Sequence, residues 1–393
     1  MSIYHDQLLK LKNDGRLREL RPLTGRHGCR AEMHGQTMLN LISNDYLGIA
    51  GDSSIQASFY AGMNSENLLE QYGLGAASSR LLSGDYTSTH ELEEALSSAY
   101  GYPAALFFNS GYHANIGLLP ALFGKGDLIL SDKLNHASIH DGMMLCRAAH
   151  KRYNHCDYKH LENLLEKNRE KYARVVIVSE SVFSMDGDVA DLRELVRLKE
   201  KYDCLVYIDE AHAIGLYGNK GLGKAEEYGV LGEIDLLVGP FGKAFASVGS
   251  FVLCTDEIRN YLINHSRSLI FTTALPPVVI SWNLFVFKLI QKMGSERNHL
   301  QNLHQNLRQN LIDHGLQTDG TTNIVPVLIG DNGVAVKAAQ CMQERGYLVF
   351  PVRPPTVPEG TARFRLSLTA DMQWIDLENV AKDIAACLDS CSK

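Results

Sequence analysis

The sequence predicts an α/β fold, with a large domain built on a mixed or mainly parallel sheet and a smaller C-terminal α/β domain. Short apolar runs of strand length alternate with amphipathic helical segments from about residue 100 onward. After Pro276 and Pro277 this alternation gives way to long helical segments. The length of 393 residues also exceeds what one ordinary hydrophobic core supports. We therefore expect an N-terminal arm over 1–42, a large domain over 43–277 and a small domain over 278–393.

The elements of the large domain follow one another in a regular order. A helix over 88–100 is predicted to open with a capping box, in which Ser88 and Glu91 each satisfy a backbone N–H. Short apolar runs then predict strands at 104–108, 128–131, 175–179, 204–208, 236–239 and 251–254. Helix-period segments at 161–169 and 192–201 stand between them, a pattern typical of a sheet buried on both faces.

The predicted small domain contains more helix than the predicted large domain. Residues 278–315 indicate long helices, and 324–329 indicates a strand. A helix near 334–345 precedes a proline-rich loop at 351–358. The residues of 362–368 alternate as in a strand, and a helix ends the chain.

One uncharged stretch, 269–287, is about long enough to span a bilayer. It contains Pro276 and Pro277, which would break the helix that a lipid phase demands. We therefore expect a buried loop followed by a core helix, and no membrane partner.

Composition narrows the class of function. The chain is 45% hydrophobic and carries a formal net charge of −7, with its lysines and arginines scattered. This argues against nucleic acid or anionic lipid as the main partner. The eight cysteines form no Cys-x-x-Cys pair, so we expect reduced thiols. The first residues show no signal peptide, so we expect a cytoplasmic protein that acts on small molecules.

Two further candidate sites are weak. The segment 218–225 nearly matches a phosphate-binding P-loop, but Ala225 stands where a magnesium-binding Ser or Thr is needed. Six potential metal ligands crowd one region without a known ligand spacing: His136, His140, His150, His155, Cys156 and His160. We expect hydrogen-bonded or surface histidines there, and no metal.

A stronger candidate lies where predicted strands end. The strand 204–208 runs into Asp209 and His212, and the strand 236–239 leads to Lys243. Ligands of open α/β sheets bind at the carboxyl ends of strands. Lys243 could form a structural ion pair, but a desolvated lysine is also an imine-forming nucleophile. The segment 107–112 predicts a strand, a glycine turn and a helix start whose N–H groups suit a phosphate. A carboxylate, an amine and a phosphate cup match what pyridoxal phosphate requires.

With these residues the sequence resembles the α-oxoamine synthases, a family of fold-type I pyridoxal-phosphate enzymes with an aspartate-aminotransferase-like fold. The resemblance covers nearly the whole chain. It rests on NDYLG at 44–48, YGLGAASSR at 72–80, NHAS at 135–138, VFSMDGD at 182–188, DEAH at 209–212, FGK at 241–243, RPPTVP at 353–358 and GTARFR at 360–365. The last two motifs are most similar to members of the biotin pathway. Such members condense L-alanine with a pimeloyl thioester to give 8-amino-7-oxononanoate, carbon dioxide and free thiol.

The resemblance implies a role for each matching residue. Lys243 would form the Schiff base with pyridoxal 5'-phosphate and act as acid and base at the substrate Cα, while Asp209 would keep the pyridinium nitrogen protonated. Other cofactor contacts would come from Gly111, Tyr112, His136, Ser184, His212 and Thr273, the last reaching the phosphate of a partner subunit in a homodimer. The catalytic set would be Lys243, His136, Asp209 and His212.

Substrate contacts are implied in the same way. Arg365 would bind the amino-acid carboxylate, a geometry suited to guanidinium. The other substrate residues would be Arg18, Asn44, His136, Arg353 and Thr356. The acyl group would arrive on coenzyme A or on an acyl carrier protein.

One position departs from the family pattern. The family usually has Thr or Ser three residues before the lysine, donating a hydroxyl to the phosphate, whereas this chain has Pro240. We expect weaker cofactor retention without loss of activity. Two other hypotheses stay open: a sister activity that uses glycine or serine with another acyl thioester, and a non-catalytic homologue.

Overall fold

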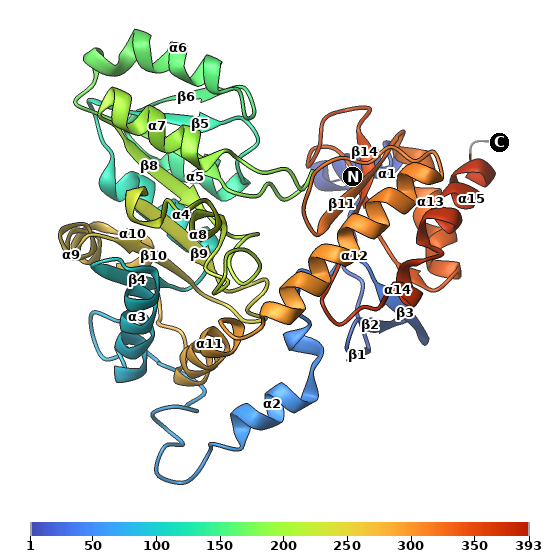
Figure 1. Ribbon diagram of the computed structural model, residues 1–393, viewed down its shortest axis with the longest axis horizontal. Coiled ribbons are helices and arrows are strands. Elements are labelled where there is room, and N and C mark those ends of the chain that lie inside the picture. The colour runs from blue at the N-terminus through green and yellow to red at the C-terminus, as the bar shows by residue number, and fades with distance from the viewer. Residues whose placement is uncertain (1, 392–393) are drawn as a thin grey trace. The chain divides into compact units, whose positions relative to one another are not determined.

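The computed structural model describes residues 2–391, which pack as two compact units (Figure 1). Unit 1 contains the chain up to Asp52, the short segment Ser184–Asp188 and the chain from Ser295 onward. Unit 2 contains Ser53–Phe183 and Val189–Gly294. Each unit is therefore assembled from separate pieces of the sequence.

Unit 2 is built on a seven-stranded mixed sheet in the order β4-β10-β9-β8-β7-β5-β6. The strands are β4 (Ala104–Phe108), β5 (Asp127–Asp132), β6 (Ala149–Tyr153), β7 (Arg174–Glu180), β8 (Leu205–Asp209), β9 (Leu236–Pro240) and β10 (Ser250–Cys254). The strands from β9 to β6 pair in parallel, whereas β10 pairs antiparallel with both β9 and β4. This confirms the predicted α/β fold with a mixed sheet.

The strand β6 was not predicted from the sequence. It lies at one edge of the sheet, and its segment Ala-His-Lys-Arg-Tyr is buried only at Tyr153. An edge strand with charged residues avoids pairing with other chains, but it shows no apolar run. The signal used for the other strands is therefore missing here.

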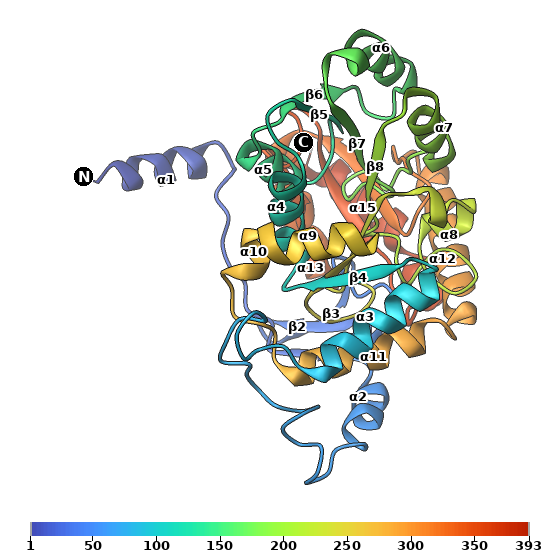
Figure 2. The same ribbon diagram turned by 90° about the vertical axis from the view of Figure 1, so that its left-hand side faces the viewer.

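Helices connect the strands of unit 2 and cover the sheet (Figure 2). They are α2 (Ser53–Tyr60), α3 (Thr87–Tyr100), α4 (Gly111–Leu122), α5 (Ala137–Leu145), α6 (Tyr158–Asn168), α7 (Leu192–Tyr202), α8 (Lys224–Tyr228), α9 (Asp256–His265), α10 (Arg267–Ile270) and α11 (Pro277–Ile290). Side chains from α4, such as Leu118, pack with strand residues such as Ile129, Val176 and Tyr207 to form a core cluster. Burying such side chains stabilises the unit by roughly 25 cal/mol for each Å² of apolar surface removed from water.

The capping box predicted for α3 is wrong. The helix begins at Thr87, so Ser88 falls inside its first turn, and the N-cap Tyr86 makes no side-chain capping bond. Ser88 is buried instead, and its Oγ has no hydrogen-bond partner among the described residues.

Unit 1 contains two small sheets. One has the order β1-β2-β3-β12, with β12 parallel to β3, and the other has the antiparallel order β11-β14-β13. The strands are β1 (Gly25–His27), β2 (Arg30–Met33), β3 (Gln36–Asn40), β11 (Ile324–Gly330), β12 (Tyr347–Leu348), β13 (Pro351–Val352) and β14 (Ala362–Ser367). The helices are α1 (Ile3–Asn13), α12 (Gly294–Asp313), α13 (Asn332–Glu344), α14 (Trp374–Leu377) and α15 (Val380–Cys391). The first helix, α1, buries none of its residues and projects outward in Figure 2.

The division into units differs from the predicted domains at α11. This helix groups with unit 2, because Trp282 Nε1 donates to the carbonyl of Ala246 at 3.3 Å and Asn283 Nδ2 donates to that of Val248 at 3.0 Å. Phe287 of α11 also stacks on Tyr100 of α3. Among the helices described between residues 2 and 391, none is long and apolar enough to cross a membrane.

The expectation that all cysteines are reduced is wrong for one pair. Cys341 of α13 and Cys387 of α15 form a disulfide across 46 residues of sequence. The pairing joins two helices that pack on each other, a proximity that sequence spacing does not reveal.

Candidate active site

The centre of the candidate site is the Asp209 carboxylate, at the carboxyl end of the parallel strand β8. The residue is 3% exposed, and its Oδ2 accepts from Asn115 Nδ2 at 2.9 Å. Its Oδ1 accepts from the backbone N–H of Ala211, also at 2.9 Å. Asn115 is held in turn by the Tyr207 hydroxyl, which donates to its Oδ1. These two hydrogen bonds fix the orientation of the buried carboxylate.

His136 lies near this carboxylate, at the N-cap of α5. Its Nδ1 is 2.7 Å from Ser138 Oγ, and its backbone N–H donates to Glu180 Oε1 at 2.5 Å. Burial lowers the pKa of His136, Asp209 opposes this shift, and the positive charge of Lys243 adds to it. The imidazole is therefore held in its neutral form at neutral pH.

Lys243 follows β9 on a tight loop. The loop closes through a hydrogen bond from the backbone N–H of Ala246 to the carbonyl of Lys243, at 2.8 Å. The lysine charge acts on the pKa of both His136 and Glu180, as does that of Asp209. The amine, the imidazole and the carboxylates therefore form one electrostatic cluster at the carboxyl ends of neighbouring strands.

At the start of α4, the backbone of Gly111 lies close to Pro240. Ser110 caps this helix by accepting from the backbone N–H of His113 at 3.1 Å. A Cβ added at Gly111 would lie 2.6 Å from Pro240 Cγ, so only glycine fits against the proline ring. The first N–H groups of a helix have no partner within it and attract anions. Tyr112 is 46% exposed, and its hydroxyl donates to Asp141.

This set of groups fits pyridoxal phosphate. A buried carboxylate suits a protonated ring nitrogen, a lysine amine suits the aldehyde, and a helix start without side-chain bulk suits the phosphate. His212, three residues after Asp209, is also buried, at 4% exposure.

The predicted amino-acid carboxylate site lies on β14 in unit 1. Arg365 donates to the carbonyl of Ser184, to Asn44 Oδ1 at 3.2 Å, to Ser367 Oγ at 2.6 Å and to the Tyr46 hydroxyl at 3.1 Å. All of these acceptors are neutral, and no ion pair of Arg365 is found among residues 2–391. Asn44, predicted as another substrate residue, is thus a direct hydrogen-bond partner of Arg365.

Three of the other predicted substrate residues, Arg18, Arg353 and Thr356, also lie in unit 1. Arg18 donates to Thr356 Oγ1 at 2.8 Å, and Arg353 donates to the carbonyl of Gly15. Partial burial and the charges of Arg18 and Arg21 lower the pKa of Arg353. This mutual repulsion marks a local excess of positive charge.

Two predicted cofactor residues have other surroundings. Ser184 belongs to unit 1, where its carbonyl accepts from Arg365. The carbonyl of Thr273 accepts from Asn109 Nδ2 at 2.7 Å, and the same amide donates to Thr272 Oγ1 at 3.2 Å. Thr273 is therefore fixed beside the turn that leads into α4.

Sequence reasoning missed Glu180 and Asn115. Glu180 ends β7 directly opposite Asp209 on β8, and it is fully enclosed. Burial, together with the charge of Asp209, raises the pKa of Glu180 to about 8. An acidic residue directly after the apolar run 175–179 was a usable signal for Glu180. No comparable signal marked Asn115 within its helix.

Comparisons with known proteins agree with this geometry. Residues 36–384 match the family model of aminotransferase class I and II. The chain is 49% identical over 372 residues to the 8-amino-7-oxononanoate synthase of Chlorobaculum parvum, covering 95% of each chain.

Two solved structures are also similar. One is a serine palmitoyltransferase from S. paucimobilis with a bound PLP–myriocin aldimine, at 28% identity and a TM-score of 0.90, covering 99% of this chain and 97% of that one. The other is 8-amino-7-oxononanoate synthase from Francisella tularensis, at 26% identity and a TM-score of 0.77, covering 91% and 99%. From its sequence and its fold, this chain belongs to the class I and II aminotransferase family and, within it, to the α-oxoamine synthases, which are pyridoxal-phosphate enzymes.

Proposed function

We propose that the chain condenses L-alanine with a pimeloyl thioester, releasing carbon dioxide and the free thiol and forming 8-amino-7-oxononanoate. The observation that carries this is the cluster of the buried Asp209 with His136 and Lys243 at the carboxyl ends of neighbouring parallel strands. The relative from Chlorobaculum parvum, which bears the name of this activity, supports the choice of substrates.

Each residue of the site has its own role in proton transfer or in stabilising charge. Bound pyridoxal phosphate supplies an electron sink for the negative charge that develops at the substrate Cα. Asp209 holds the proton on the ring nitrogen, and its carboxylate is oriented by hydrogen bonds from Asn115 and the backbone of Ala211. Lys243 holds the cofactor before substrate arrives, then removes and returns a proton at Cα. His136 contributes an uncharged ring face, and His212 accepts or donates at the phenolic oxygen.

Substrate binding falls to unit 1 in this proposal. Arg365 takes the carboxylate of L-alanine through its positive charge and a charge-assisted hydrogen bond, a strong form of carboxylate recognition. Arg18, Arg353 and Thr356 bind the acyl thioester, whose carrier is coenzyme A or an acyl carrier protein. Gly111, Tyr112 and Ser184 complete the cofactor contacts.

A second candidate is a sister reaction with serine and a long-chain acyl thioester. It is favoured by the higher TM-score to serine palmitoyltransferase, 0.90 against 0.77 for the Francisella enzyme. Discrimination between substrates that differ by one small group is worth only about 1–3 kcal/mol, so both candidates require a direct test.

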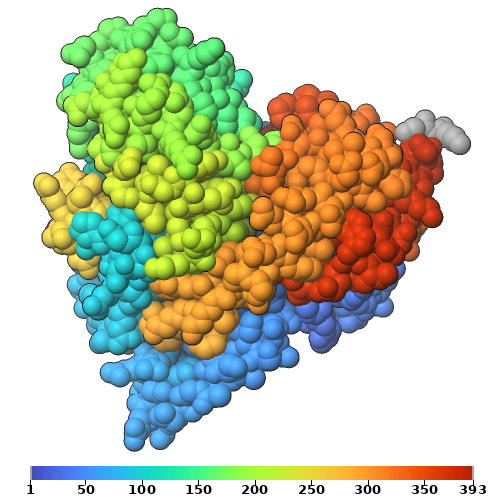
Figure 3. Space-filling view, viewed as in Figure 1, coloured from blue at the N-terminus to red at the C-terminus, as the bar shows by residue number. Residues whose placement is uncertain are grey.

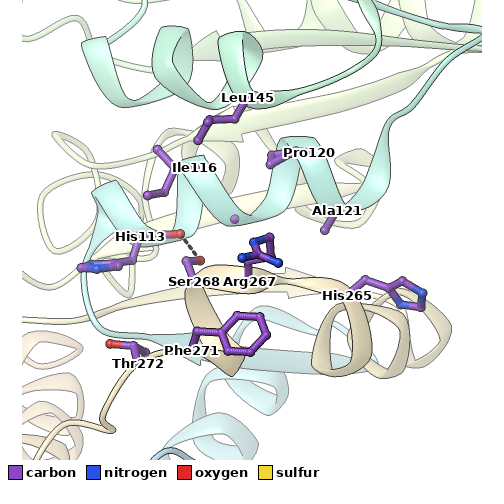
Figure 4. Close-up of a pocket in the computed structure, with 11 residues that line it drawn as sticks. His113, Ile116, Pro120, Ala121, Leu145, His265, Arg267, Ser268, Phe271 and Thr272 are labelled. Carbon is purple, nitrogen blue, oxygen red and sulfur yellow. Dashed lines mark hydrogen bonds between the residues drawn. The ribbon is translucent and has the colours of Figure 1, made fainter.

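A homodimer is part of the proposal. Unit 2 exposes large apolar side chains in the segment between α2 and α3, shown in light blue in Figure 3, where Leu69, Leu74 and Leu82 are 80–88% exposed. A cavity of about 420 Å³ lies between α4 and α10, and its rim carries Leu145 and Phe271, which are 62% and 70% exposed (Figure 4).

A second copy of the chain would cover these apolar groups. Thr272 lines the cavity, and its neighbour Thr273 would then reach the partner's phosphate. Light scattering at micromolar concentration should give twice the mass of the chain. A monomer would remove this part of the proposal.

The deciding experiment is a titration of the cofactor-loaded protein with L-alanine, glycine and L-serine, followed through the cofactor absorption band. A band shift at the lowest concentration with alanine, followed by turnover with pimeloyl-CoA, supports the proposed reaction. A preference for serine or glycine moves the activity to a sister enzyme. The absence of a cofactor band would favour a non-catalytic homologue.

A further inference from the structure

A network of buried hydrogen bonds joins two side chains of the candidate active site, Asp209 and His136. The network consists of Asn115 on α4, Ser138 in the first turn of α5 and Tyr207 on β8. These three residues are 1%, 1% and 0% exposed. The proposed function uses only the bond from Asn115 to Asp209, so the remaining bonds of the network have no role assigned to them.

The amide of Asn115 has one orientation that satisfies all of its neighbours. Its Nδ2 donates to Asp209 Oδ2 and to Ser138 Oγ, each at 2.9 Å. Its Oδ1 accepts from the Tyr207 hydroxyl. An amide nitrogen carries two N–H donors, whereas the amide oxygen only accepts, so both donors and the acceptor are used. A flipped amide would bring its oxygen against a carboxylate oxygen. Asn115 is thus fixed as a donor to Ser138.

Ser138 passes this orientation on to the imidazole of His136. Its Oγ lies 2.7 Å from His136 Nδ1. Because Oγ accepts from Asn115, its own hydrogen can be donated to that ring nitrogen. The backbone N–H of Ser138 also donates to Nδ1, at 3.3 Å. A backbone N–H cannot accept, so a proton on Nδ1 would set two donors against each other. Nδ1 must therefore carry the lone pair.

The proton of the neutral His136 ring is then on Nε2. Burial is the largest cause that lowers the pKa of His136, and the charge of Lys243 adds to it, whereas Asp209 and Asp141 oppose it. The neutral form therefore prevails at and above neutral pH. In this form the imidazole offers a ligand a donor at Nε2 and no acceptor. A ligand group at Nε2 must consequently be an acceptor, such as a carboxylate or carbonyl oxygen.

We propose that Asn115 and Ser138 are positioning residues that hold His136 in the tautomer with its proton on Nε2. Asn115 acts on His136 through Ser138, and it acts on Asp209 directly. One amide therefore sets both the hydrogen-bonding character of the imidazole and the orientation of the carboxylate. The inference rests on the proposed function only for placing His136 and Asp209 in the cofactor site, and the state of the ring can be measured without substrate.

The test is nitrogen NMR of the cofactor-loaded protein with isotope-labelled histidines at pH 8. The shifts of the two ring nitrogens report which of them carries the proton, and the signals that disappear in His136→Gln belong to His136. In the wild type we expect the tautomer protonated on Nε2 to exceed the other at least about tenfold. A ring protonated mainly on Nδ1, or an even mixture, would overturn the proposal, whichever amino acid the enzyme uses.

A serine variant tests the hydroxyl. Ser138→Ala keeps the backbone N–H but loses the O–H donor, so the excess of the Nε2 tautomer should fall about three- to tenfold. Ser250→Ala is the matched control and should leave the ratio unchanged. Ser250 is also buried, but its hydroxyl donates to the carbonyl of Phe251, at 3.5 Å. No change in Ser138→Ala, or the same loss in both variants, would refute the role of the Ser138 hydroxyl.

The role of Asn115 is tested by a double-mutant cycle. Asn115→Ala should lower the tautomer excess about threefold in the wild-type background and change it little in the Ser138→Ala background. Its effect on Asp209 should persist, so the cofactor dissociation constant from equilibrium dialysis should rise at least about threefold in both backgrounds. Equal changes of the tautomer ratio in the two backgrounds would show that Asn115 does not act through Ser138. If Asn115→Ala does not fold, the wild-type and Ser138→Ala spectra decide the matter.

Discussion

The two units differ in what surrounds their charged site residues. In unit 2, the charges of the buried Asp209 and the partly exposed Lys243 act on the same neighbours, His136 and Glu180. In unit 1, Arg365 is surrounded by neutral oxygens, although Arg363, two residues earlier on β14, forms an ion pair with Asp186. A balanced cluster suits a cofactor that stays bound, whereas an oriented but uncompensated cation suits a substrate anion that comes and goes. In the proposed function, Asp209 and Lys243 hold the bound cofactor and are called the resident site. Arg365 binds the substrate and is called the exchange site.

The largest effect is expected at the resident site. Lys243→Ala should lower kcat by a factor of about 10⁴ or more, because it removes both the covalent attachment and the proton transfer. Steady-state turnover with alanine and pimeloyl-CoA measures this. Lys220→Ala, at an exposed position, is the control and should retain activity. A loss of less than tenfold in Lys243→Ala would mean that another amine performs the chemistry.

The exchange site can be tested by comparing neighbouring arginines on one strand. Arg365→Lys keeps the charge but loses the planar fork, and we expect kcat/KM for alanine to fall about a hundredfold, which corresponds to about 2.7 kcal/mol. Arg363→Lys can keep its ion pair with Asp186, so its kcat/KM should change little. If both variants behave alike, the neutral surroundings of Arg365 have no special meaning for substrate binding.

A smaller effect is expected at Pro240, which lies against Gly111 at the start of α4. Pro240→Thr adds a hydroxyl donor, and one charge-assisted hydrogen bond is worth about 1.5–3 kcal/mol. We expect the cofactor dissociation constant to fall about tenfold. Equilibrium dialysis against pyridoxal phosphate gives the value, and Pro240→Ala controls for loss of the ring. Equal affinities in the Thr and Ala variants would rule out the hydroxyl as the cause.

The smallest effect concerns the pH dependence of stability. Burial and the charge of Asp209 raise the pKa of Glu180 from 4.5 to about 8. The folded state therefore binds this proton more tightly than the unfolded state, and the contribution of Glu180 to stability falls as pH rises from about 4.5 to about 8.

Glu180→Gln removes that dependence while keeping an acceptor for the backbone N–H of His136. The Tm of this variant minus that of the wild type should be more positive at pH 8 than at pH 5, by a few degrees at most. Exposed Glu257→Gln serves as the control, with no such trend. A pH-independent difference for Glu180→Gln would show that the buried carboxyl does not titrate in this range.

Functional residues could be predicted from the sequence where a charged residue follows an apolar run. Asp209 directly follows the apolar run that became β8, and Lys243 lies four residues after the end of the run that became β9, so their location could be predicted from the strand ends. The edge strand β6 could not be predicted in this way, because most of its side chains face water and its sequence has no apolar run.

Other features depend on distances that only the folded chain defines. The pairing of Cys341 with Cys387 and the bond from Asn115 to Asp209 each join residues far apart in sequence. Glu180 was missed for a different reason. Its position directly after an apolar run is a usable local signal, but its register opposite Asp209 is set by strand pairing.

The pairing of β12 with β3 has a consequence for how the chain is made. Leu39 is aligned with Tyr347, so a strand synthesised early must wait for its partner until about 300 further residues have emerged. At a synthesis rate of about 5–20 residues per second, that delay is roughly 15–60 s. During this time β3 can pair with β2 but not with β12, so Met38 lacks Leu348, with which it shares a core cluster in the finished unit. The N-terminal segment is therefore a natural client for chaperones that bind nascent chains, and C-terminal truncation should leave it permanently exposed.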